Sequence, residues 1–141
     1  MMQKVPVKIL REGAALPTYG TASSAGADLR ACLDAPAVLA PGETRLIPIG
    51  IAMEIPEGYV GLVFARSGLA VKKGLALSNG VGVIDSDYTG EIKVGLVHLG
   101  TEPVTIQPGE RIAQLAVMPV LLPEIREVDA LDATARGAGG F

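Results

Sequence analysis

The chain has little of what would give it disulfides, a membrane anchor or an affinity for nucleic acid. Cys32 is its only cysteine, which excludes an internal disulfide framework and is typical of a reducing compartment. No run approaches the roughly 18 apolar residues of a membrane span, and the first residues lack the apolar core of a signal peptide. We therefore expect a soluble, cytoplasmic protein with no membrane partner, in which Cys32 is a small buried side chain.

Charge is scarce as well, and its balance is slightly negative. Twelve lysines and arginines face 15 aspartates and glutamates, for a net charge of -3, so no basic field would attract a nucleic-acid polymer. A few local arginines could still hold a small anion. Hydrophobic residues make up 49% and charged residues 19% of the 141 residues. This length and apolar content suffice for one domain with a sizeable core. Because the charged residues are too few to cover a monomer, we expect part of the apolar surface to be buried between subunits.

Strand patterns fill the interior of the chain. Residues 45–55 alternate with period two, and residues 91–99 do the same, which is typical of half-buried strands. Turns built from proline, glycine and glutamate separate such runs at residues 41–43, 56–58 and 108–110. Together these patterns predict an all-β fold, a distorted jelly roll or β-barrel.

One helix and one tail complete the outline. A short helix is predicted over Ser67–Lys73, with Ser67 capping its first turn and Gly74 ending its last. Residues 1–128 are expected to form a single β-barrel domain. Residues 129–141 are too rich in glycine for regular structure, and we expect them to form a flexible tail that is mobile when nothing is bound.

His98, the only histidine, falls on the core face of the strand predicted at residues 91–99. A metal ligand would need partners, and the chain offers no second histidine and a single cysteine. We therefore interpret His98 as a structural imidazole that is hydrogen-bonded inside the core.

An apolar run that ends in carboxylates spans residues 80–92, with the sequence Gly-Val-Gly-Val-Ile-Asp-Ser-Asp-Tyr-Thr-Gly-Glu-Ile. A carboxylate at the end of a buried run costs free energy unless it is hydrogen-bonded or kept wet by a cleft. Asp85 is therefore either a turn-forming residue or a general base. Asp-Ser-Asp followed by a glycine is also ordinary hairpin chemistry, so both interpretations stay open.

Two further spots could bind an anion. In residues 65–70, Arg66, Ser67 and free backbone amides converge where a strand meets the short helix, and all of them donate hydrogen bonds to phosphate. A capped helix with a surface arginine is the alternative. Gln114 lies in a run that is apolar on both faces, so its amide needs partners from either the protein or a ligand.

Asp28 and the tail each allow two interpretations. Asp28 precedes Arg30 by two residues and shares its strand face, so a salt bridge between them and a functional carboxylate are both possible. In the tail, Arg136 and Phe141 stand among glycines. A lid closing on a nucleotide would carry this combination, with the ring on a base and the arginine on phosphate. A disordered terminus is the alternative.

Taken in order, these five segments resemble the five motifs of the trimeric dUTPases, the deoxyuridine triphosphate nucleotidohydrolases. Any one motif is weakly specific, but five in this order and spacing run nearly from end to end of the chain. The resemblance implies a jelly-roll homotrimer with three active sites, each built from all three subunits, in which the tail of one chain covers the site of another. The matching segments are residues 25–29, 65–70, 82–92, 109–115 and 136–141.

The resemblance also implies a reaction. The aspartate that matches Asp85 would activate a water for in-line attack on the α-phosphate of dUTP, giving dUMP and pyrophosphate. This reaction keeps uracil out of DNA and supplies dUMP for thymidylate synthesis. Mg²⁺ would be held mainly by phosphates and waters, with Asp28 acting on the metal through its waters. The residues that match phosphate contacts of the family are Arg66, Ser67, Gln114 and Arg136.

Selectivity for dUTP would come from a hairpin over residues 79–88, which matches the uracil slot of the family. There, backbone groups and Asn79 would read the base edge and leave no room for a 5-methyl group, while cytosine would leave buried groups unpaired at about 1–3 kcal/mol each. Tyr88 matches the tyrosine that packs on deoxyribose and excludes a 2'-hydroxyl, and Phe141 matches the ring that stacks over uracil. The other substrate-binding residues implied are Gly68, Gly82, Val83, Ile84 and Lys93.

The chain departs from the family pattern in two places. Ala65 stands where the family usually has proline, which would loosen a turn without removing a contact. The sequence stops at Phe141, whereas the family continues with a Gly-Ser-Thr-Gly-like segment that wraps the γ-phosphate. A protein that ended at this residue should close poorly over its substrate; a protein that continued beyond it could carry the missing segment.

Three other functions fit parts of the sequence. A dCTP deaminase shares the fold but uses other motif residues and a glutamate, so the Arg-Ser-Gly-Leu-Ala and Asp-Ser-Asp-Tyr segments favour a dUTPase. A catalytically silent trimer would bind dUTP without turnover, and the presence of Asp85 argues against it. Calcium binding at residues 85–90 begins like an EF-hand loop, but Leu96 stands where that loop needs a glutamate.

Overall fold

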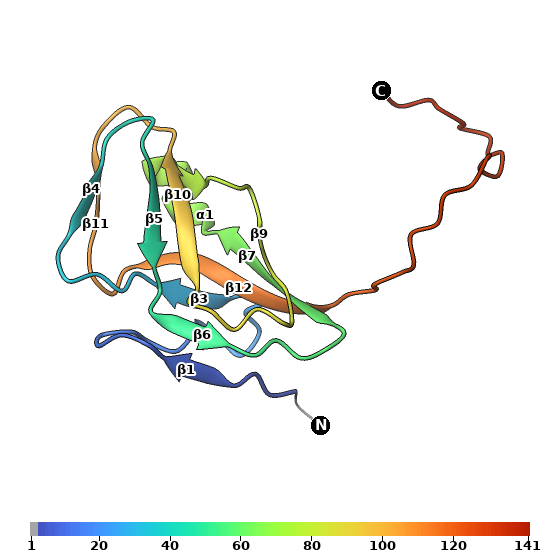
Figure 1. The fold of residues 1–141 in the computed structure, drawn as a ribbon. Coiled ribbons are helices and arrows are strands. Elements are labelled where there is room, and N and C mark those ends of the chain that lie inside the picture. The colour runs from blue at the N-terminus through green and yellow to red at the C-terminus, as the bar shows by residue number, and fades with distance from the viewer. Residues whose placement is uncertain (1–2) are drawn as a thin grey trace.

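The computed structural model describes residues 3–141, which form a body of short strands with one helix and a long carboxyl-terminal extension (Figure 1). The helix is α1 (Ser67–Lys73), as predicted. The strands are β1 (Val7–Ile9), β2 (Thr18–Tyr19), β3 (Ala27–Arg30), β4 (Ala37–Leu39), β5 (Thr44–Pro48), β6 (Ile51–Met53), β7 (Tyr59–Ala65), β8 (Leu75–Leu77), β9 (Gly82–Ile84), β10 (Lys93–His98), β11 (Val104–Ile106) and β12 (Arg111–Pro119).

The strands pair antiparallel in separate sheets with the orders β2-β3-β12-β7-β9, β5-β10-β8, β1-β6 and β11-β4. The all-β prediction is confirmed, but a closed barrel is not formed by the residues that the structure describes. Most strands are only two to five residues long, and the chain changes sheets before any ladder can close. The arrangement agrees with a distorted jelly roll.

The core lies between the five-stranded sheet and the sheet of β5, β10 and β8, which cross each other in Figure 1. The alternation predicted for residues 91–99 is confirmed, because Ile92, Val94, Leu96 and His98 are all buried. The fully buried side chains of the core come from both sheets and include Leu29, Ile47, Leu75, Leu96 and Ile112. These opposed apolar faces hold the two sheets together.

The alternating run at residues 45–55 is not one straight strand. It is divided between β5 and β6, which lie in different sheets, and the corner between them is at Gly50. The φ of Gly50 is +78°, and a Cβ there would lie 2.8 Å from the Cβ of Ala14 and 2.9 Å from the Sγ of Cys32. Glycine satisfies both the left-handed backbone and the lack of space. The period-two pattern continues through the corner because Ile47 and Ile51 are buried on either side of it.

The helix begins and ends as predicted, but its first turn is capped differently. Gly74 has a φ of +72° and donates to the carbonyl of Ala70, so it ends the helix as expected. The N-cap residue is Arg66, and no side chain caps the first turn. Ser67 is already inside the helix, so the prediction that its hydroxyl would cap the helix is wrong. That hydroxyl is free to face the neighbouring pocket instead.

Two single residues behave as the sequence predicted. His98 is 1% exposed, its Nδ1 accepts from the amide of Gly100 at 3.2 Å, and its Nε2 contacts the carbonyl of Glu102. An imidazole with both nitrogens engaged by backbone is structural. Cys32 is buried next to Gly50. Both side chains therefore serve the packing of the body.

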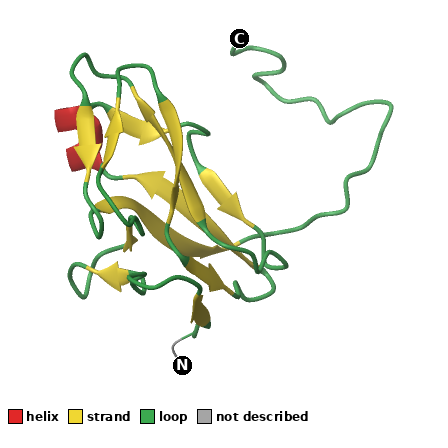
Figure 2. Cartoon of the chain, turned by 60° about the vertical axis from the view of Figure 1, so that its left-hand side comes forward, coloured by secondary structure: helices red, strands yellow, loops and turns green. Residues whose placement is uncertain are grey.

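Beyond β12 the chain leaves the body and runs through solvent, as the orange-to-red trace of Figure 1 and the loop on the right of Figure 2 show. Residues 121–141 are all exposed. The amide of Val120 still donates to the carbonyl of Gly58 at 2.9 Å. The exposed apolar side chains of the extension are Leu121, Leu122, Ile125, Val128 and Leu131. No helix in the described part of the chain is long and apolar enough to cross a bilayer.

Candidate functional site

One cavity of about 550 Å³ is built around residues 79–95, and we call it the Asp85 pocket. Its apolar wall comes from core strands, including Leu46, Val63 and Leu77. Seven residues that the sequence assigned to the site line this one cavity: Asn79, Gly82, Val83, Ile84, Asp85, Tyr88 and Lys93.

The backbone around the Asp85 pocket differs from the expected hairpin. β9 pairs with β7, through Gly61↔Ile84 and Val63↔Gly82, and residues 79–88 do not pair among themselves as two strands. β9 therefore forms the edge of the five-stranded sheet, where its unpaired side is open to the cavity. A ligand in the pocket could use the backbone groups that an edge strand leaves free.

Asp85 follows β9 directly and is exposed, whereas Ile84 before it is buried. The amide of Tyr88 donates to the carbonyl of Asp85 at 3.1 Å, so this residue does start a turn. Its carboxylate has no ion-pair partner within residues 3–141 and lines the cavity. Turn formation by the backbone and proton acceptance by the side chain are therefore compatible, and the sequence posed them as alternatives.

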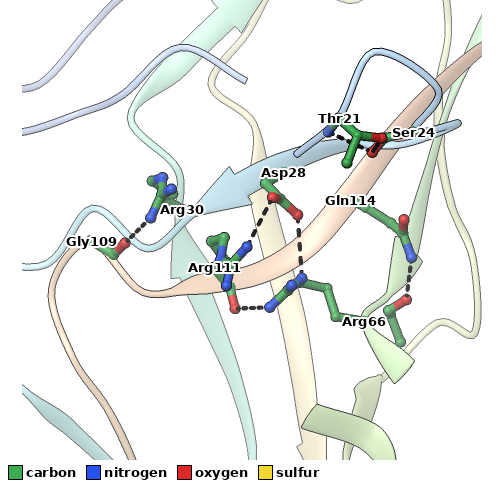
Figure 3. Close-up of polar contacts among 9 residues, drawn as sticks. Thr21, Ser24, Asp28, Arg30, Arg66, Gly109, Arg111 and Gln114 are labelled. Carbon is green, nitrogen blue, oxygen red and sulfur yellow. Dashed lines mark hydrogen bonds and ion pairs between the residues drawn. The ribbon is translucent and has the colours of Figure 1, made fainter. Parts of the chain in front are cut away.

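A second cavity of about 340 Å³, which we call the arginine pocket, contains the other five predicted residues of the body: Asp28, Arg66, Ser67, Gly68 and Gln114. Asp28 lies between two guanidiniums (Figure 3). Its Oδ1 is 3.3 Å from Nε of Arg66, and its Oδ2 is 3.5 Å from Nη1 of Arg111. The pocket thus carries two cations on one anion, a net positive site suited to a phosphate group.

Two sequence interpretations are corrected here. Arg30 does not pair with Asp28 but donates from Nη1 to the carbonyl of Gly109 at 3.1 Å. Arg111 takes the place expected for Arg30, because β3 lies beside β12 in the sheet. Sequence reasoning missed Arg111 as a site residue. The available signal was its place directly after the Pro-Gly-Glu turn and three residues before Gln114.

The amide of Gln114 is held in place within the arginine pocket. Its Nε2 donates to the carbonyl of Ala65 at 3.0 Å. On its other side, a Cβ at Gly26 would lie 2.5 Å from Oε1 of Gln114, so only glycine leaves room there. The protein supplies one partner, and the second N–H of the amide remains available to a ligand.

The two pockets have no lining residue in common. Two strands, β12 and β7, separate the Asp28 strand from β9, which corresponds to roughly 14 Å across the sheet. Asp28 is level with Phe64 through Gln114. Ile84 is level with Gly61, and Asp85 lies one residue further along, which adds about 13 Å along the strands. One copy of the chain therefore does not bring Asp85 and Asp28 to the same phosphate.

The two predicted tail residues lie outside both pockets. Arg136 donates from Nε to the carbonyl of Gly139 at 2.6 Å, and the amide of Gly137 donates to Oγ1 of Thr134 at 3.0 Å. These bonds close a small turn within the tail itself. Phe141 is fully exposed. The predicted residues thus fall into three groups, those of the Asp85 pocket, those of the arginine pocket and those of the tail. The tail extends away from the body (Figure 2).

Glu91 is a further pocket residue that the sequence did not single out. It lines the Asp85 pocket and forms an ion pair with Arg11. Hydrogen bonds from the Arg11 guanidinium lower the pKa of Glu91 below its ordinary value, and the same pair raises the pKa of Arg11. Glu91 is therefore held as a carboxylate. No local pattern predicts this pair, because its members are 80 residues apart in the chain.

The residues of the body do not form a metal site of their own. Within residues 3–141 no three histidine, cysteine, aspartate or glutamate side chains are close enough together to hold a metal ion. Each carboxylate oxygen of Asp28 faces a guanidinium, which competes with a cation for the same lone pairs. The donor set therefore does not fit a Mg²⁺ ion bound by protein side chains.

Comparison with known families and proteins identifies what this chain is similar to. The family model described as dUTPase matches residues 12–141. The deoxyuridine 5'-triphosphate nucleotidohydrolase of Desulfitobacterium hafniense (strain DSM 10664 / DCB-2) is 51% identical over 141 residues, which are 98% of this chain and 93% of that protein. The enzyme of the same name from Salmonella arizonae is 51% identical over 146 aligned residues, covering 100% of this chain and 96% of that protein.

Solved structures lead to the same family. A point mutant of the dUTPase of Staphylococcus bacteriophage 80alpha superposes with a TM-score of 0.89 at 30% identity, covering 100% of this chain and 98% of that one. Another mutant of that enzyme, in complex with dUpNHpp, gives 0.84 at 27% identity and covers 94% and 100%. A mutant dUTPase of phage phi11 of S. aureus, described with a structural Mg(II) ion, gives 0.84 at 26% identity and covers 93% and 100%.

Proposed function

This chain belongs to the dUTPase family and is a deoxyuridine 5'-triphosphate nucleotidohydrolase, and we propose that Asp85 activates the water molecule that attacks dUTP. The water oxygen forms a bond to the α-phosphorus of dUTP while the bond from that phosphorus to the α-β bridging oxygen breaks. Asp85 accepts the proton of the water, and the products are dUMP and pyrophosphate. The reaction removes the precursor of uracil in DNA and supplies dUMP for thymidylate synthesis.

The position of Asp85 supports this role. The carboxylate stands at the end of a buried strand, is open to a cavity and has no ion-pair partner within residues 3–141. A carboxylate without an ion-pair partner at this position can accept a proton from a water in the cavity. Asp87 belongs to the same turn but does not line the cavity. The proposal therefore assigns the proton transfer to Asp85 alone.

The Asp85 pocket would hold the uracil and the deoxyribose. Asn79 and the backbone of Gly82, Val83 and Ile84 offer donors and acceptors at an open sheet edge, which suits reading of a base edge. The apolar wall would exclude a 5-methyl group by lack of room. Tyr88 would pack against the deoxyribose, and Lys93 lies at the rim of the same cavity, where its charge favours an anion.

The arginine pocket would hold the phosphates. Arg66 and Arg111 carry the charge, and Ser67, Gly68 and Gln114 add polar lining. Donors of this kind are shared over several oxygens of a triphosphate in phosphoryl-transfer enzymes. Asp28 would orient the two guanidiniums toward the phosphates. The resemblance implied instead that Asp28 acts on Mg²⁺ through its waters, and the two ion pairs with arginine support the orienting role.

A complete site would combine the pockets of different copies of the chain. The two pockets lie too far apart on one copy to act on the same α-phosphate, by the sheet spacings given above. Exposed apolar side chains, such as Leu46, Val83 and Leu122, are consistent with subunit contacts in a homotrimer. The tail, residues 129–141, would close over a site of another copy, with Phe141 stacked on uracil and Arg136 on phosphate.

Mg²⁺ would come to this site as part of the substrate. A triphosphate carries several negative charges that bind Mg²⁺, and Mg²⁺ keeps much of its water shell in such complexes. The reported Mg(II) ion of the phage phi11 enzyme is described as structural. For this chain the steps proposed above use only the protein residues, the substrate and water.

The observation that supports the proposal most is that twelve predicted body residues gather in only two cavities. A complementation experiment tests it. Asp85→Asn chains alone are expected to be nearly inactive, and Arg66→Gln chains alone are expected to be nearly inactive at a dUTP concentration well below their raised KM. Mixed oligomers from co-expression contain sites in which Asp85 comes from one chain and Arg66 from the other. We expect such oligomers to recover dUTP hydrolysis, and Asp87→Asn mixed with Arg66→Gln serves as a control for expression.

The outcomes separate the parts of the proposal. Recovery on mixing supports shared sites. No recovery, with both variants folded and assembled, would contradict them and place the whole site in one chain. A parallel assay incubates the wild type with dUTP, dCTP, dTTP and UTP and measures pyrophosphate and ammonia. Release of ammonia from dCTP would indicate a deaminase. Binding of dUTP without any product would indicate a catalytically silent binding protein.

A further inference from the structure

An ion pair joins the wall of the Asp85 pocket to a loop 80 residues earlier in the chain. Arg11, just after β1, donates from Nε to Oε2 of Glu91 at 2.6 Å and from Nη2 to Oε1 at 2.8 Å. Two parallel bonds of this kind fix the mutual orientation of a guanidinium and a carboxylate. Because Glu91 is itself part of the pocket wall, its position is set from outside the pocket.

Backbone hydrogen bonds on both sides of β6 bring the pair together. On one side the amide of Leu10 donates to the carbonyl of Gly50 at 2.8 Å, and on the other the amide of Ile92 donates to β6, also at 2.8 Å. Arg11 follows Leu10 and Glu91 precedes Ile92 in the chain, so their side chains bridge the corner at Gly50. The side chain of Glu91 is only 17% exposed, against 48% for Arg11, which partly shields the pair from solvent.

Glu91 in turn holds Tyr88. The hydroxyl of Tyr88 donates to the carbonyl of Glu91 at 2.8 Å. The ring folds back over Gly90, where a Cβ would come within 2.7 Å of the hydroxyl oxygen. The place of the ring in the pocket therefore depends on the place of residues 90–91. The Arg11 pair is the side-chain contact that anchors them.

We propose that Arg11 is a positioning residue for sugar selection, which keeps Tyr88 where it admits a deoxyribose and excludes a ribose. The inference rests on the proposed function, in which Tyr88 packs against the sugar of dUTP. Arg11 does not line either pocket and touches no reacting group. Its loss leaves the chemical step intact and lets the wall around Tyr88 move, so the enzyme discriminates less well against UTP.

The test compares Arg11→Gln, Glu91→Gln and the double variant. In each single variant the ratio of kcat/KM for dUTP to that for UTP falls about twofold to fivefold, as expected for a partly exposed pair. The ratio is no lower in the double variant than in the single variants, because both changes remove the same interaction. The change appears in KM for dUTP, with kcat nearly constant. Arg11→Lys recovers part of the loss, since lysine keeps the charge without the two parallel bonds.

Arg45→Gln is the matched control, because Arg45 pairs with Glu43 away from both pockets. An unchanged dUTP to UTP ratio in the Arg11 and Glu91 variants, or an equal fall in Arg45→Gln, would overturn the proposal. Amide hydrogen exchange of residues 85–92 gives a second readout that needs no turnover: exchange becomes faster in Arg11→Gln and Glu91→Gln but not in Arg45→Gln. Unchanged exchange would also overturn the proposal. A wild type that failed to hydrolyse dUTP would instead count against the proposed function, and exchange would still decide on Arg11.

Discussion

The two pockets of this chain are lined by different kinds of groups. The Asp85 pocket lies at a sheet edge and is walled mostly by backbone and apolar side chains, with one unpaired carboxylate. The arginine pocket is walled mostly by charged and polar side chains that contact one another across strands (Figure 3). The first offers shape and directed hydrogen bonds, and the second offers charge. These are the separate requirements of a nucleobase and of a triphosphate.

The difference also explains why the two halves can lie on different copies of a chain. Recognition by shape needs a rigid wall, and the core behind Ile84 supplies it. Recognition by charge needs several cations around one anion, and the register of β3, β12 and β7 supplies them. The two pockets have no lining residue in common. Substitutions should therefore separate into those that affect chemistry and those that affect phosphate binding.

Asp85→Asn should have the largest effect. The amide keeps the shape of the pocket but cannot accept a proton, so kcat should fall about 10²-fold to 10⁴-fold, with the affinity for dUTP retained. Single-turnover kinetics and direct binding of a nonhydrolysable analogue would measure both. Asp87→Asn is the control in the same turn, and a variant at Asp85 with near-normal turnover would remove this residue from the mechanism.

Arg66→Gln should have the next largest effect, and of a different kind. It removes a cation from the arginine pocket and leaves Asp28 with one partner, so KM for dUTP should rise about tenfold to a hundredfold. The affinity for deoxyuridine, which lacks phosphates, should not change. Arg30→Gln is the control on the same strand as Asp28. Equal losses for dUTP and deoxyuridine would show that the pockets are not separate.

Removal of residues 134–141 should affect kcat by a smaller factor, about tenfold, because a lid acts on closure and not on the body. The melting temperature should stay the same, since this segment is exposed and its hydrogen bonds, from Arg136 to Gly139 and from Gly137 to Thr134, are internal to it. Thermal unfolding and steady-state kinetics would measure the two. Replacement of the same residues by a flexible linker of equal length is the control, and unchanged kinetics would show that the tail does not close over either pocket.

Much of the fold and of the site follows from local sequence, and apart from the cap of the helix at Ser67 the corrections concern contacts between distant segments. Strand alternation around Leu96 and the glycine that ends the helix depend on residues close in sequence, so they were predictable. The partners of Asp28 depend on which strands become neighbours, which the sequence near Asp28 does not contain. Arg111 therefore replaced Arg30. For the same reason β9 pairs with β7, where the sequence suggested a hairpin.

The tail marks the other limit of prediction. Its glycines predict that residues 129–141 lack regular structure, and the structure has no helix or strand there; the irregular extension already begins after β12, before the predicted boundary at residue 128. Its role depends on contacts that one copy of the chain does not make. The two pockets, by contrast, could be grouped only after the sheet order was known, although ten of their twelve predicted residues lie in one of the motifs. Asn79 and Lys93 are the exceptions, since they stand on either side of the motif at residues 82–92.

The smallest predicted effect concerns pH and the wall of the Asp85 pocket. Hydrogen bonds from Arg11 lower the pKa of Glu91 below its ordinary value near 4.5. A carboxyl whose pKa is lower in the folded state stabilises the protein fully above its unfolded pKa, and this contribution is lost as the pH falls through the folded pKa. The melting temperature of the wild type should therefore fall more steeply below about pH 4.5 than that of Glu91→Gln.

Glu43 provides the comparison that makes this small effect interpretable. Its pKa is also lowered, mainly by a hydrogen bond from the amide of Ala40 and further by Arg45. Part of the fall in melting temperature at low pH is therefore due to Glu43. Arg11→Gln should remove the Glu91 contribution and leave that of Glu43 in place, while Glu43→Gln should do the reverse. Because the Arg11 pair is partly exposed, its share should shrink as salt is added. If the melting temperature falls equally at low pH in wild type, Glu91→Gln and Arg11→Gln, the ion pair does not stabilise the pocket wall. If the fall changes only in the variants of Arg11 and Glu91, the pair stabilises the wall at the corner formed by Gly50.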